Sequence, residues 1–363
     1  MSKILSIIIP TYNMAALLPR CLESLVTAQD AETYLEAMVV NDGSKDSSLA
    51  VANEWKDRYP EIITVIDKKN GNYGSTINAA LPVAKGKYVK VLDSDDWFDT
   101  DALTQLLREL LQLEKEGQSV DMAITHFTQL GAHGQYEVIR YNTMGRESFE
   151  YGRIYDMDEV LASGHIRQFL MHSITYRTGL LREIHYVQTE GISYTDTEWA
   201  SHPIYHASSI IFYDINLYRY NFDREGQTMS PSVLLKSISQ MQQVLDSLIG
   251  YYDRNSGSLS PKRAVYMKKF IEHRLRLFYK LHLLDIPREN FDPQVLKEVD
   301  EKYASFVQRH HLNFDLYPEN KLLRCNYISY WRKHHSRWPR WFEWFNHQVD
   351  IVVRWLYVRI FRR

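Results

Sequence analysis

The 363-residue chain has only two cysteines and no long hydrophobic run. Cys21 and Cys325 stand far apart and lack the spacing of a metal site, so a disulfide framework is not expected and a reducing, cytoplasmic setting is the default. The first apolar run, ILSIII, stops at Pro10, and no later stretch offers the roughly 18 uncharged apolar residues that would cross a bilayer. These absences predict a chain that is neither secreted through a signal peptide nor bilayer-spanning.

A strong charge of either sign is also missing, because the formal net charge is only −2. The charges are nevertheless placed unevenly. From Lys321 onward the chain has ten Lys or Arg residues against two acidic residues, which leaves this tail at +8 and the remainder at −10. With 45% apolar and 24% charged residues the chain is an ordinary globular protein in composition. The basic tail is therefore a separate functional question.

Short apolar runs alternate with helical patterns through the first hundred residues. The expected strands are LSIII (5–9), EAMVVN (36–41), IITVID (62–67) and YVKVL (88–92). This alternation predicts right-handed βαβ units and a parallel sheet. Ligands of such sheets bind beyond the carboxyl ends of the strands, where the polar segments PTYN, NDGSKDSS, DKKNGNYGS and DSDD stand.

Beyond residue 120 the pattern changes to a mixed, partly antiparallel continuation of the same sheet, with strands expected at MAITHF, YEVIRY, SITYRT and SIIFYDINLYRY. Helical spacing of apolar residues takes over from Pro231 to about residue 312. We therefore predict an α/β domain over 1–230, a helical subdomain over 231–320 and a basic, Trp-rich tail over 321–363.

Three carboxylates crowd into the segment VLDSDDWF at 91–98. Asp93 and Asp95 are two residues apart, so an extended backbone would direct both to one side, where they could hold a divalent cation together with a diphosphate. Asp96 would then point elsewhere. The alternative is that these acids cap the helix expected near Thr100, for which Asp99 is a natural N-cap.

The segment after the second strand has a comparable ambiguity. Asp42 ends the strand and Gly43 allows a tight turn, so the carboxylate could accept hydrogen bonds from a base or a sugar. The alternative is a plain turn, with Asp46 or Ser47 capping the next helix. The GNYGS run lacks both the GxGxxG spacing and the GKS/T ending of common nucleotide loops, which disfavours a dinucleotide fold. The fourteen histidines form no convincing ligand set.

The motifs SIIIPTYNM, VVNDGSKDSS and VLDSDDW, in this order and at strand ends, resemble those of the family 2 glycosyltransferases of the GT-A fold. The resemblance covers roughly residues 4–230. It implies a Rossmann-like mixed sheet flanked by helices, here with a C-terminal helical extension, and a metal-dependent inverting transfer of sugar from a nucleotide diphosphate sugar, with UDP the expected nucleotide.

Donor-binding residues follow from the same resemblance. Asp95 is expected to hold Mg2+ or Mn2+ on the donor diphosphate, with Asp93 near the ribose and the metal. Asp42 corresponds to the acid that recognises uracil. The remaining positions expected beside the nucleotide sugar are Pro10, Thr11, Tyr12, Gly74, Asn78, Ser94 and Arg224. For Arg224, a neutralising role at the leaving diphosphate and a solvated loop position both stay open.

An inverting member needs a general base to deprotonate the acceptor hydroxyl. The family places it about a hundred residues after the DxD motif, where this chain reads GISYTDTEW at 191–199. Asp196 corresponds best to the base. The common adjacent acidic pair is absent, so Glu198 stays an alternative, and Asp196 could instead cap a helix that begins at Thr197.

The tail contains five of the eight tryptophans within its last 33 residues. Written as a helix, Trp338, Trp341, Phe345 and further apolar residues share one face, with Arg340 and Arg354 opposite. Such a face beside basic residues favours an anionic inner-leaflet surface for 331–363. The alternative is a helix packed on the catalytic domain or on a homodimer partner.

The sequence therefore predicts a cytoplasmic, peripherally membrane-bound glycosyltransferase. Its expected acceptor is a glycan or lipid-linked intermediate of cell-surface polysaccharide synthesis, and no nucleic acid partner is expected. A non-catalytic binding or scaffold protein of the same fold is the rival interpretation. A sugar-phosphate nucleotidyltransferase is less favoured, because PTYNMAALLPR lacks the glycine-rich loop that such enzymes carry after the first strand.

Overall fold

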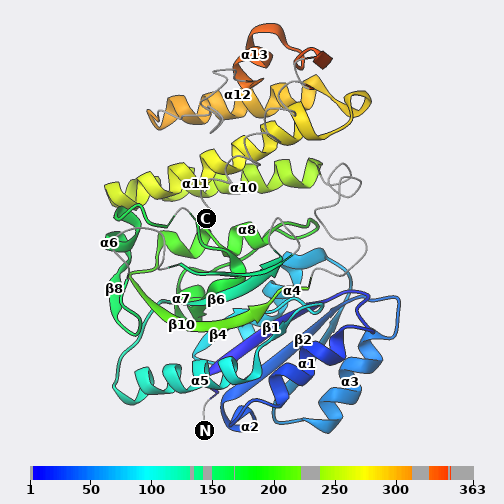
Figure 1. Cartoon of the computed structure of the whole chain (residues 1–363), viewed down its shortest axis with the longest axis vertical. Helices are drawn as coiled ribbons and strands as arrows, with labels where there is room; N and C mark the ends of the chain where they lie inside the picture. The colour runs from blue at the N-terminus through cyan, green and yellow to red at the C-terminus, as the bar shows by residue number, and fades with distance from the viewer. Residues whose placement is uncertain are drawn as a thin grey trace. The chain divides into compact units, whose positions relative to one another are not determined.

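The computed structural model describes residues 3–130, 135–141, 149–166, 168–221, 238–312, 327–341 and 344 (Figure 1). Two compact units divide the chain. Unit 1 comprises Met1–Gln227 and Asp246–Phe270, and unit 2 comprises Thr228–Leu245 and Ile271–Arg363. The boundary at 227 lies close to the predicted end of the catalytic domain at 230. Residues 246–270 join unit 1, whereas the predicted division placed them in the helical subdomain.

A single mixed sheet forms the centre of unit 1. Its strands are β1 (Leu5–Thr11), β2 (Leu35–Asp42), β3 (Ile63–Lys68), β4 (Tyr88–Val91), β5 (Trp97–Phe98), β6 (Met122–Leu130), β7 (Tyr136–Ile139), β8 (Ile154–Asp156), β9 (Ile174–Arg177) and β10 (Ser209–Arg219). They are ordered β3-β2-β1-β4-β9-β6-β10-β5, with β7 paired to β6 and β8 paired to β10.

The first four strands confirm the predicted parallel half of the sheet. β1 pairs in parallel with both β2 and β4, and β2 pairs in parallel with β3. The second half is mixed, as predicted, because β9 runs antiparallel to β4 and β6, whereas β10 runs parallel to β6. The sheet core is continuous, and the side chains of β2 are buried along the whole strand.

Helices connect and cover these strands. Those of the first half are α1 (Leu18–Val26), α2 (Ala31–Tyr34), α3 (Ser48–Arg58), α4 (Asn72–Ala80) and α5 (Thr100–Lys115). Shorter helices α6 (Met157–Ala162), α7 (Thr178–Glu183) and α8 (Asp196–Trp199) follow. In Figure 1, α1 and α3 lie on the same face of the sheet.

Local sequence explains where these helices begin and which face they bury. In α1 the buried residues Leu18, Cys21, Leu22 and Leu25 recur at intervals of three and four, the spacing of one helical face. In α5 the predicted N-cap is confirmed, because the Asp99 carboxylate accepts the backbone N–H of Ala102 at 3.0 Å.

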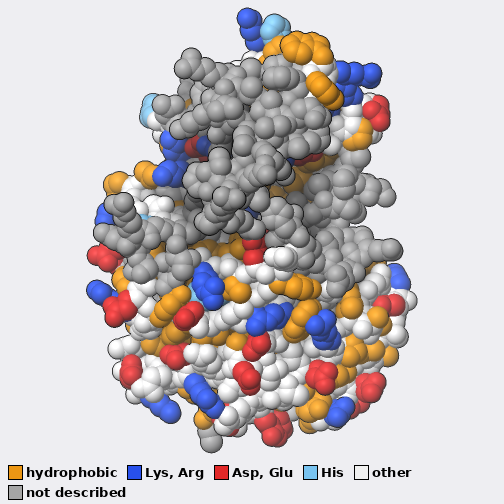
Figure 2. All heavy atoms as spheres, in the orientation of Figure 1, with side chains coloured by type: hydrophobic (Ala, Val, Ile, Leu, Met, Phe, Trp, Pro, Cys, Tyr) orange, Lys and Arg blue, Asp and Glu red, His pale blue; other side chains and the backbone are white. Residues whose placement is uncertain are grey.

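Longer helices occupy the C-terminal part of the chain: α10 (Ile238–Asn255), α11 (Pro261–Lys280), α12 (Pro293–Arg309) and α13 (Tyr327–His334). This confirms the predicted change to helical spacing. On the face of unit 1 visible in Figure 2, basic and acidic side chains are interspersed. Among the described residues, no helix combines the length and hydrophobicity that crossing a bilayer requires.

The described part of the tail differs from a single amphipathic helix. Helix α13 ends at His334, and residues 335–339 are not helical. Pro339 explains the interruption, because proline restricts the residue before it and has no N–H to donate. Trp338 is consequently buried, in edge contact with Tyr327, whereas Trp341 is 69% exposed. Phe345 and Arg354, expected on the same helix, lie outside the described residues.

Candidate active site

The loops after β1 and β2 are held together by side-chain hydrogen bonds at the carboxyl end of the sheet. The Asp46 carboxylate accepts the backbone N–H groups of Ala15 and Ser48, and the Asn13 side-chain oxygen accepts the backbone N–H of Lys45. Asp46, one of the two residues predicted to cap α3, therefore stabilises the turn before this helix. Gly43 has a positive φ of 68°, which confirms the tight turn after Asp42.

Tyr12 and Thr11 occupy the end of β1 in different ways. The Tyr12 side chain is 44% exposed, so its ring is accessible beside the strand ends. Thr11 is buried, and its hydroxyl donates to the backbone oxygen of Ile9 at 3.1 Å. The Pro10 backbone oxygen accepts the Ser94 hydroxyl at 2.8 Å, which fastens the loop after β4 to the end of β1.

The two carboxylate oxygens of the buried Asp42 differ in their hydrogen bonds. Its Oδ1 accepts from the Lys68 ammonium at 2.8 Å, from the Gly71 backbone N–H at 2.9 Å and from the Ser75 hydroxyl at 3.3 Å. No hydrogen bond to Oδ2 is found within the described part of the chain. One oxygen thus fixes the beginning of α4, and the other can accept from a ligand.

The two predicted residues on α4 contact a loop that lies 110 residues further along. A Cβ on Gly74 would stand 2.2 Å from the backbone oxygen of Thr189, so only glycine permits this close approach. The Asn78 amide donates to the Gln188 backbone oxygen at 2.9 Å and to the Glu190 carboxylate at 2.8 Å, and it accepts the Gln188 backbone N–H at 2.9 Å. Both residues therefore position the segment 188–190.

The DSDD segment forms a turn, and the extended backbone expected for it is wrong. The backbone N–H of Asp96 donates to the Asp93 carbonyl at 3.0 Å, which closes the turn. As a result Asp96 does not point away from Asp93: ligand atoms of Asp93, Asp96 and His172 all lie within 4.8 Å of one another. Asp93 and Asp95 are half-buried, whereas Asp96 is 3% exposed.

Tyrosine hydroxyls hold the acids of this turn in place. Tyr73, on α4, donates its hydroxyl to Asp93 at 3.0 Å. Tyr218, on β10, donates to the buried Asp96, which also accepts the backbone N–H of Asn221 at 2.7 Å. The turn is thereby anchored to α4 on one side and to the end of β10 on the other.

The acids have a marked effect on the titration of their neighbours. Burial raises the pKa of the Asp96 carboxyl well above its usual range, and the charges of Asp93 and Asp95 raise it further. Burial followed by the charge of Asp93, then of Asp196, raises the pKa of the Tyr73 hydroxyl in the same way. The site is electronegative, and a bound cation would lower this accumulated repulsion.

Asp196 and Glu198 have different environments, although they are two residues apart. Glu198 is fully buried, and its carboxylate accepts the Thr189 backbone N–H at 2.8 Å and the Thr189 hydroxyl at 2.7 Å. Asp196 is half-buried and is the first residue of α8, one position earlier than the predicted helix start. Its charge acts on both Tyr73 and Tyr220, the tyrosines on which the charges of the DSDD acids also act.

A buried lysine lies beneath this region, and sequence reasoning missed it. Lys90, on β4, is fully buried and donates to the backbone oxygens of His172 at 2.7 Å and Ile174 at 3.1 Å. Burial lowers the Lys90 pKa to about 7. Burial, and then Lys90, lowers the pKa of His172 to about 3, which keeps its imidazole neutral and able to bind a metal.

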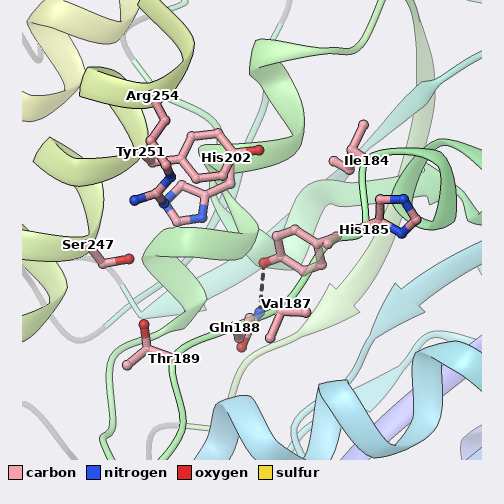
Figure 3. Close-up of a pocket in the computed structure, with 10 residues that line it drawn as sticks. Ile184, His185, Val187, Gln188, Thr189, His202, Ser247, Tyr251 and Arg254 are labelled. Atoms are coloured by element: carbon pink, nitrogen blue, oxygen red, sulfur yellow. Dashed lines mark hydrogen bonds between the residues drawn. The ribbon is translucent and has the colours of Figure 1, made fainter.

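A separate cavity of about 340 Å³ lies against the segment 184–189 (Figure 3). The His202 ring stacks on Tyr251 with 3.9 Å between centroids, and the Gln188 amide donates to the Tyr186 hydroxyl at 3.0 Å. The cavity shares Gln188 with the segment that Asn78 holds. It contains none of the acids described above.

Several residues of the site carried no recognised signal in the sequence. Lys68 and Tyr73 belong to DKKNGNYGS, which stands at a strand end, but only Gly74 and Asn78 of this region were expected beside the donor. His172 and Tyr218 come from the second half of the sheet, and only the fold brings them to the DSDD turn. Arg224, the predicted partner of the leaving diphosphate, lies outside the described residues.

The sheet order, with acidic and aromatic residues gathered at the carboxyl ends of its strands, defines a GT-A fold. Residues 6–170 match the family model described as Glycosyl transferase family 2, so this segment of the chain belongs to that family. A hyaluronan synthase from Pasteurella multocida is 23% identical over 373 residues, covering 88% of this chain and 36% of the synthase. The chain thus spans little more than a third of that relative's length.

Solved structures share the same fold. S. aureus TarS 1–349, crystallised with UDP-GlcNAc, superposes with a TM-score of 0.51 at 17% identity, covering 86% of this chain and 93% of that one. The mannosyltransferase PcManGT from Pyrobaculum calidifontis, in complex with GDP-Man and Mn2+, gives a TM-score of 0.51 at 15% identity over 85% of this chain and 76% of that one. Both identities are low enough that these neighbours establish the fold alone.

Proposed function

We propose that this chain transfers a sugar from a UDP-sugar to a hydroxyl group of a glycan or lipid-linked acceptor, with inversion at the anomeric carbon. The observation that carries the proposal is that the charges of both Asp93 and Asp196 act on the Tyr73 hydroxyl, so the candidate base and the DSDD acids share a neighbour. A leaving-group site and a candidate base at one location are what an inverting transfer requires.

The nucleotide would lie at the ends of β1 and β2. Asp42 Oδ2 would accept the N–H of uracil, which is supported by the finding that Lys68, Gly71 and Ser75 all bind the other oxygen. The exposed Tyr12 ring could stack on the base. TarS, in which UDP-GlcNAc is bound, supports a uridine nucleotide for a chain of this fold.

The diphosphate would lie over the DSDD turn. The half-buried Asp93 and Asp95 offer carboxylate oxygens, the donors that Mg2+ and Mn2+ prefer, and the neutral His172 adds a nitrogen beside Asp93. A divalent cation bound there would supply charge neutralisation to the departing diphosphate. Tyr73 and Tyr218 keep the turn in place, so that its carboxylates need not reorganise when the donor binds.

Asp196 would accept the proton of the acceptor hydroxyl as that oxygen attacks the anomeric carbon. Its neighbour Glu198 is fully buried and occupied by two hydrogen bonds from Thr189, which makes it a poor candidate for proton transfer to a ligand. Glu198 would instead position α8 and thereby Asp196.

Transfer and hydrolysis of UDP-sugars with Mn2+ test the proposal, with UDP affinity measured by calorimetry. We expect Asp95→Ala to lose metal-dependent UDP binding and turnover, and Asp196→Asn to lose turnover by about 10²- to 10⁴-fold while still binding UDP. Asp57→Asn, which alters an exposed carboxylate on α3, is the matched control. Failure of the wild type to bind any nucleotide sugar would favour the scaffold interpretation.

We also propose that the tail attaches the chain to an anionic membrane surface. Trp341 and Trp344 support this, because they are 69% and 65% exposed, whereas Trp331 and Trp338 are buried and belong to the packing of unit 2. We expect the double substitution Trp341→Ala with Trp344→Ala to weaken sedimentation with phosphatidylserine vesicles at least tenfold. Val83→Ala, at another exposed apolar side chain, should leave vesicle binding intact.

A further inference from the structure

A second cavity, of about 510 Å³, lies at the far end of the sheet from Asp42. The residues that line it include Arg20, Trp97, Tyr136, Arg219, Tyr220 and Asn221. They come from α1, β5, β7 and the end of β10. In the strand order, β4 with its DSDD turn separates β1 and β2 from this group. The cavity and the expected nucleotide site therefore lie on opposite sides of the acids.

The cavity shares a wall with the acid cluster. Trp97 follows Asp96 directly in the chain, and the Asn221 backbone N–H donates to the Asp96 carboxylate at 2.7 Å. Burial, and then the charges of the three DSDD acids and of Asp196, raises the pKa of the Tyr220 hydroxyl to about 12. A ligand in this cavity would therefore border the acid cluster.

The two arginines of the cavity differ in whether their charges are paired with a carboxylate. Arg219 donates to the Thr128 hydroxyl at 2.9 Å and to the Asp99 carboxylate at 3.0 Å, so its charge is already paired. Arg20 is exposed, and its guanidinium lies 3.2 Å from the centre of the Trp97 ring. Within the described part of the chain, Arg20 has no carboxylate partner. Of the two described arginines that line the cavity, Arg20 is therefore the one without an ion pair.

Aromatic surface accompanies this charge. The Tyr136 side chain is 62% exposed at the cavity, and Trp97 is half-buried beneath Arg20. Aromatic rings offer flat apolar faces to the C–H side of a sugar ring, while a guanidinium forms paired hydrogen bonds with phosphate or carboxylate. The volume is in the range that holds a small ligand.

We propose that this cavity is the acceptor subsite and that it is built for an anionic glycan, with Arg20 binding a phosphate or carboxylate group of the acceptor chain. The inference rests on the proposed glycosyl transfer and adds the chemical class of the acceptor. The acceptor hydroxyl would approach from the β10 side, and the donor from the β2 side, with Asp196 and the DSDD turn between them.

The test measures binding of three oligomers of similar length in the presence of UDP and Mn2+: a glycerol phosphate tetramer, a hyaluronan tetrasaccharide and the neutral maltotetraose. We expect the protein to bind at least one charged oligomer more tightly than maltotetraose. Arg20→Gln should weaken that binding about tenfold, and Arg20→Lys should restore part of it. Raising the salt concentration from about 50 to about 500 mM should weaken wild-type binding more than Arg20→Gln binding.

The matched control is Arg58→Gln. Arg58 is another exposed arginine beside aromatic rings, 5.2 Å from the centre of Tyr59, but it lies on α3 and does not line the cavity. Its substitution should leave oligomer binding unchanged. The charged oligomer that responds to Arg20→Gln identifies the group, phosphate or carboxylate, that this residue recognises.

Titration with UDP alone separates failure of this inference from failure of the proposed function. A protein that does not bind UDP contradicts the glycosyl transfer itself. A protein that binds UDP refutes the acceptor inference if no oligomer binds, if maltotetraose binds as tightly as the charged oligomers, or if Arg20→Gln and Arg58→Gln have equal effects.

Discussion

Substitution of Glu198 tests whether its carboxylate positions α8 or takes the proton of the acceptor. Its two oxygens accept the backbone N–H and the hydroxyl of Thr189 in a fully buried setting. Glu198→Ala leaves both donors without an acceptor and creates a small cavity. An unsatisfied buried donor costs about 1–3 kcal/mol, so we expect a loss of roughly 2–4 kcal/mol in the free energy of unfolding.

The decisive variant is Glu198→Gln. The amide oxygen can accept the Thr189 N–H, and the amide nitrogen can donate to the Thr189 hydroxyl, which rotates to accept it. The loop geometry is then kept, and only the ability to take a proton is lost. We expect Glu198→Gln to retain stability within about 1 kcal/mol and turnover within about threefold, because its role is positional. Asp196→Asn should show the reverse, with stability kept and turnover lost.

Thermal unfolding and UDP-sugar turnover with Mn2+ measure the two effects, with turnover read well below the midpoint of unfolding. For a unit of this size, the loss for Glu198→Ala corresponds to a decrease in Tm of roughly 4–8 °C. Glu54→Gln, an exposed glutamate on α3, controls for the change in charge. If Glu198→Gln lowered turnover more than about 100-fold at unchanged Tm, and Asp196→Asn did not, the base would be Glu198.

Two further predictions concern stability. Gly74→Ala should lower the free energy of unfolding by about 1–3 kcal/mol, because its Cβ would meet Thr189 O at 2.2 Å. Gly257→Ala is the control, since a Cβ there has open space around it and should change the stability little. Equal midpoints of urea unfolding for the two variants would contradict this prediction. Below about pH 7, Lys90 is charged in both the folded and the unfolded chain, so its burial lowers the free energy of unfolding by the full amount. Between pH 7 and the ordinary lysine pKa of 10.5, the folded chain loses this proton while the unfolded chain keeps it, so the cost of burial decreases as the pH rises. We expect wild type to gain about 2–3 kcal/mol over Lys90→Met between pH 7 and pH 9, and a pH-independent difference would disprove the assignment.

Much of the fold could be predicted because local patterns carried the information. β-rich apolar runs separated by helices identified the four strands of the first, parallel half of the sheet, and the change in pattern near residue 120 marked the mixed half. Asp99 was recognisable as a helix cap from its place before Thr100. The family motifs stood at strand ends, where the topology brings polar residues together.

Prediction failed where contacts distant in sequence set the geometry. The spacing of Asp93 and Asp95 suggested an extended segment, but tertiary hydrogen bonds hold a turn that brings Asp96 to Asp93 instead. The sequence contains Pro339, but the helical spacing of the tryptophans nevertheless predicted one continuous helix. The separate surroundings of Trp338 and Trp341 became apparent only in the structure.

The sequence by itself determined the four strands of the parallel half, the positions of the acidic motifs and the family to which they point, because these depend on neighbouring residues and short periodicities. Only the tertiary structure decided which oxygen of Asp42 is left for a ligand, which acid near α8 is fully occupied, and which residues accompany the DSDD turn. Those distinctions depend on hydrogen bonds between residues about 10 to 125 positions apart, and no local pattern encodes them.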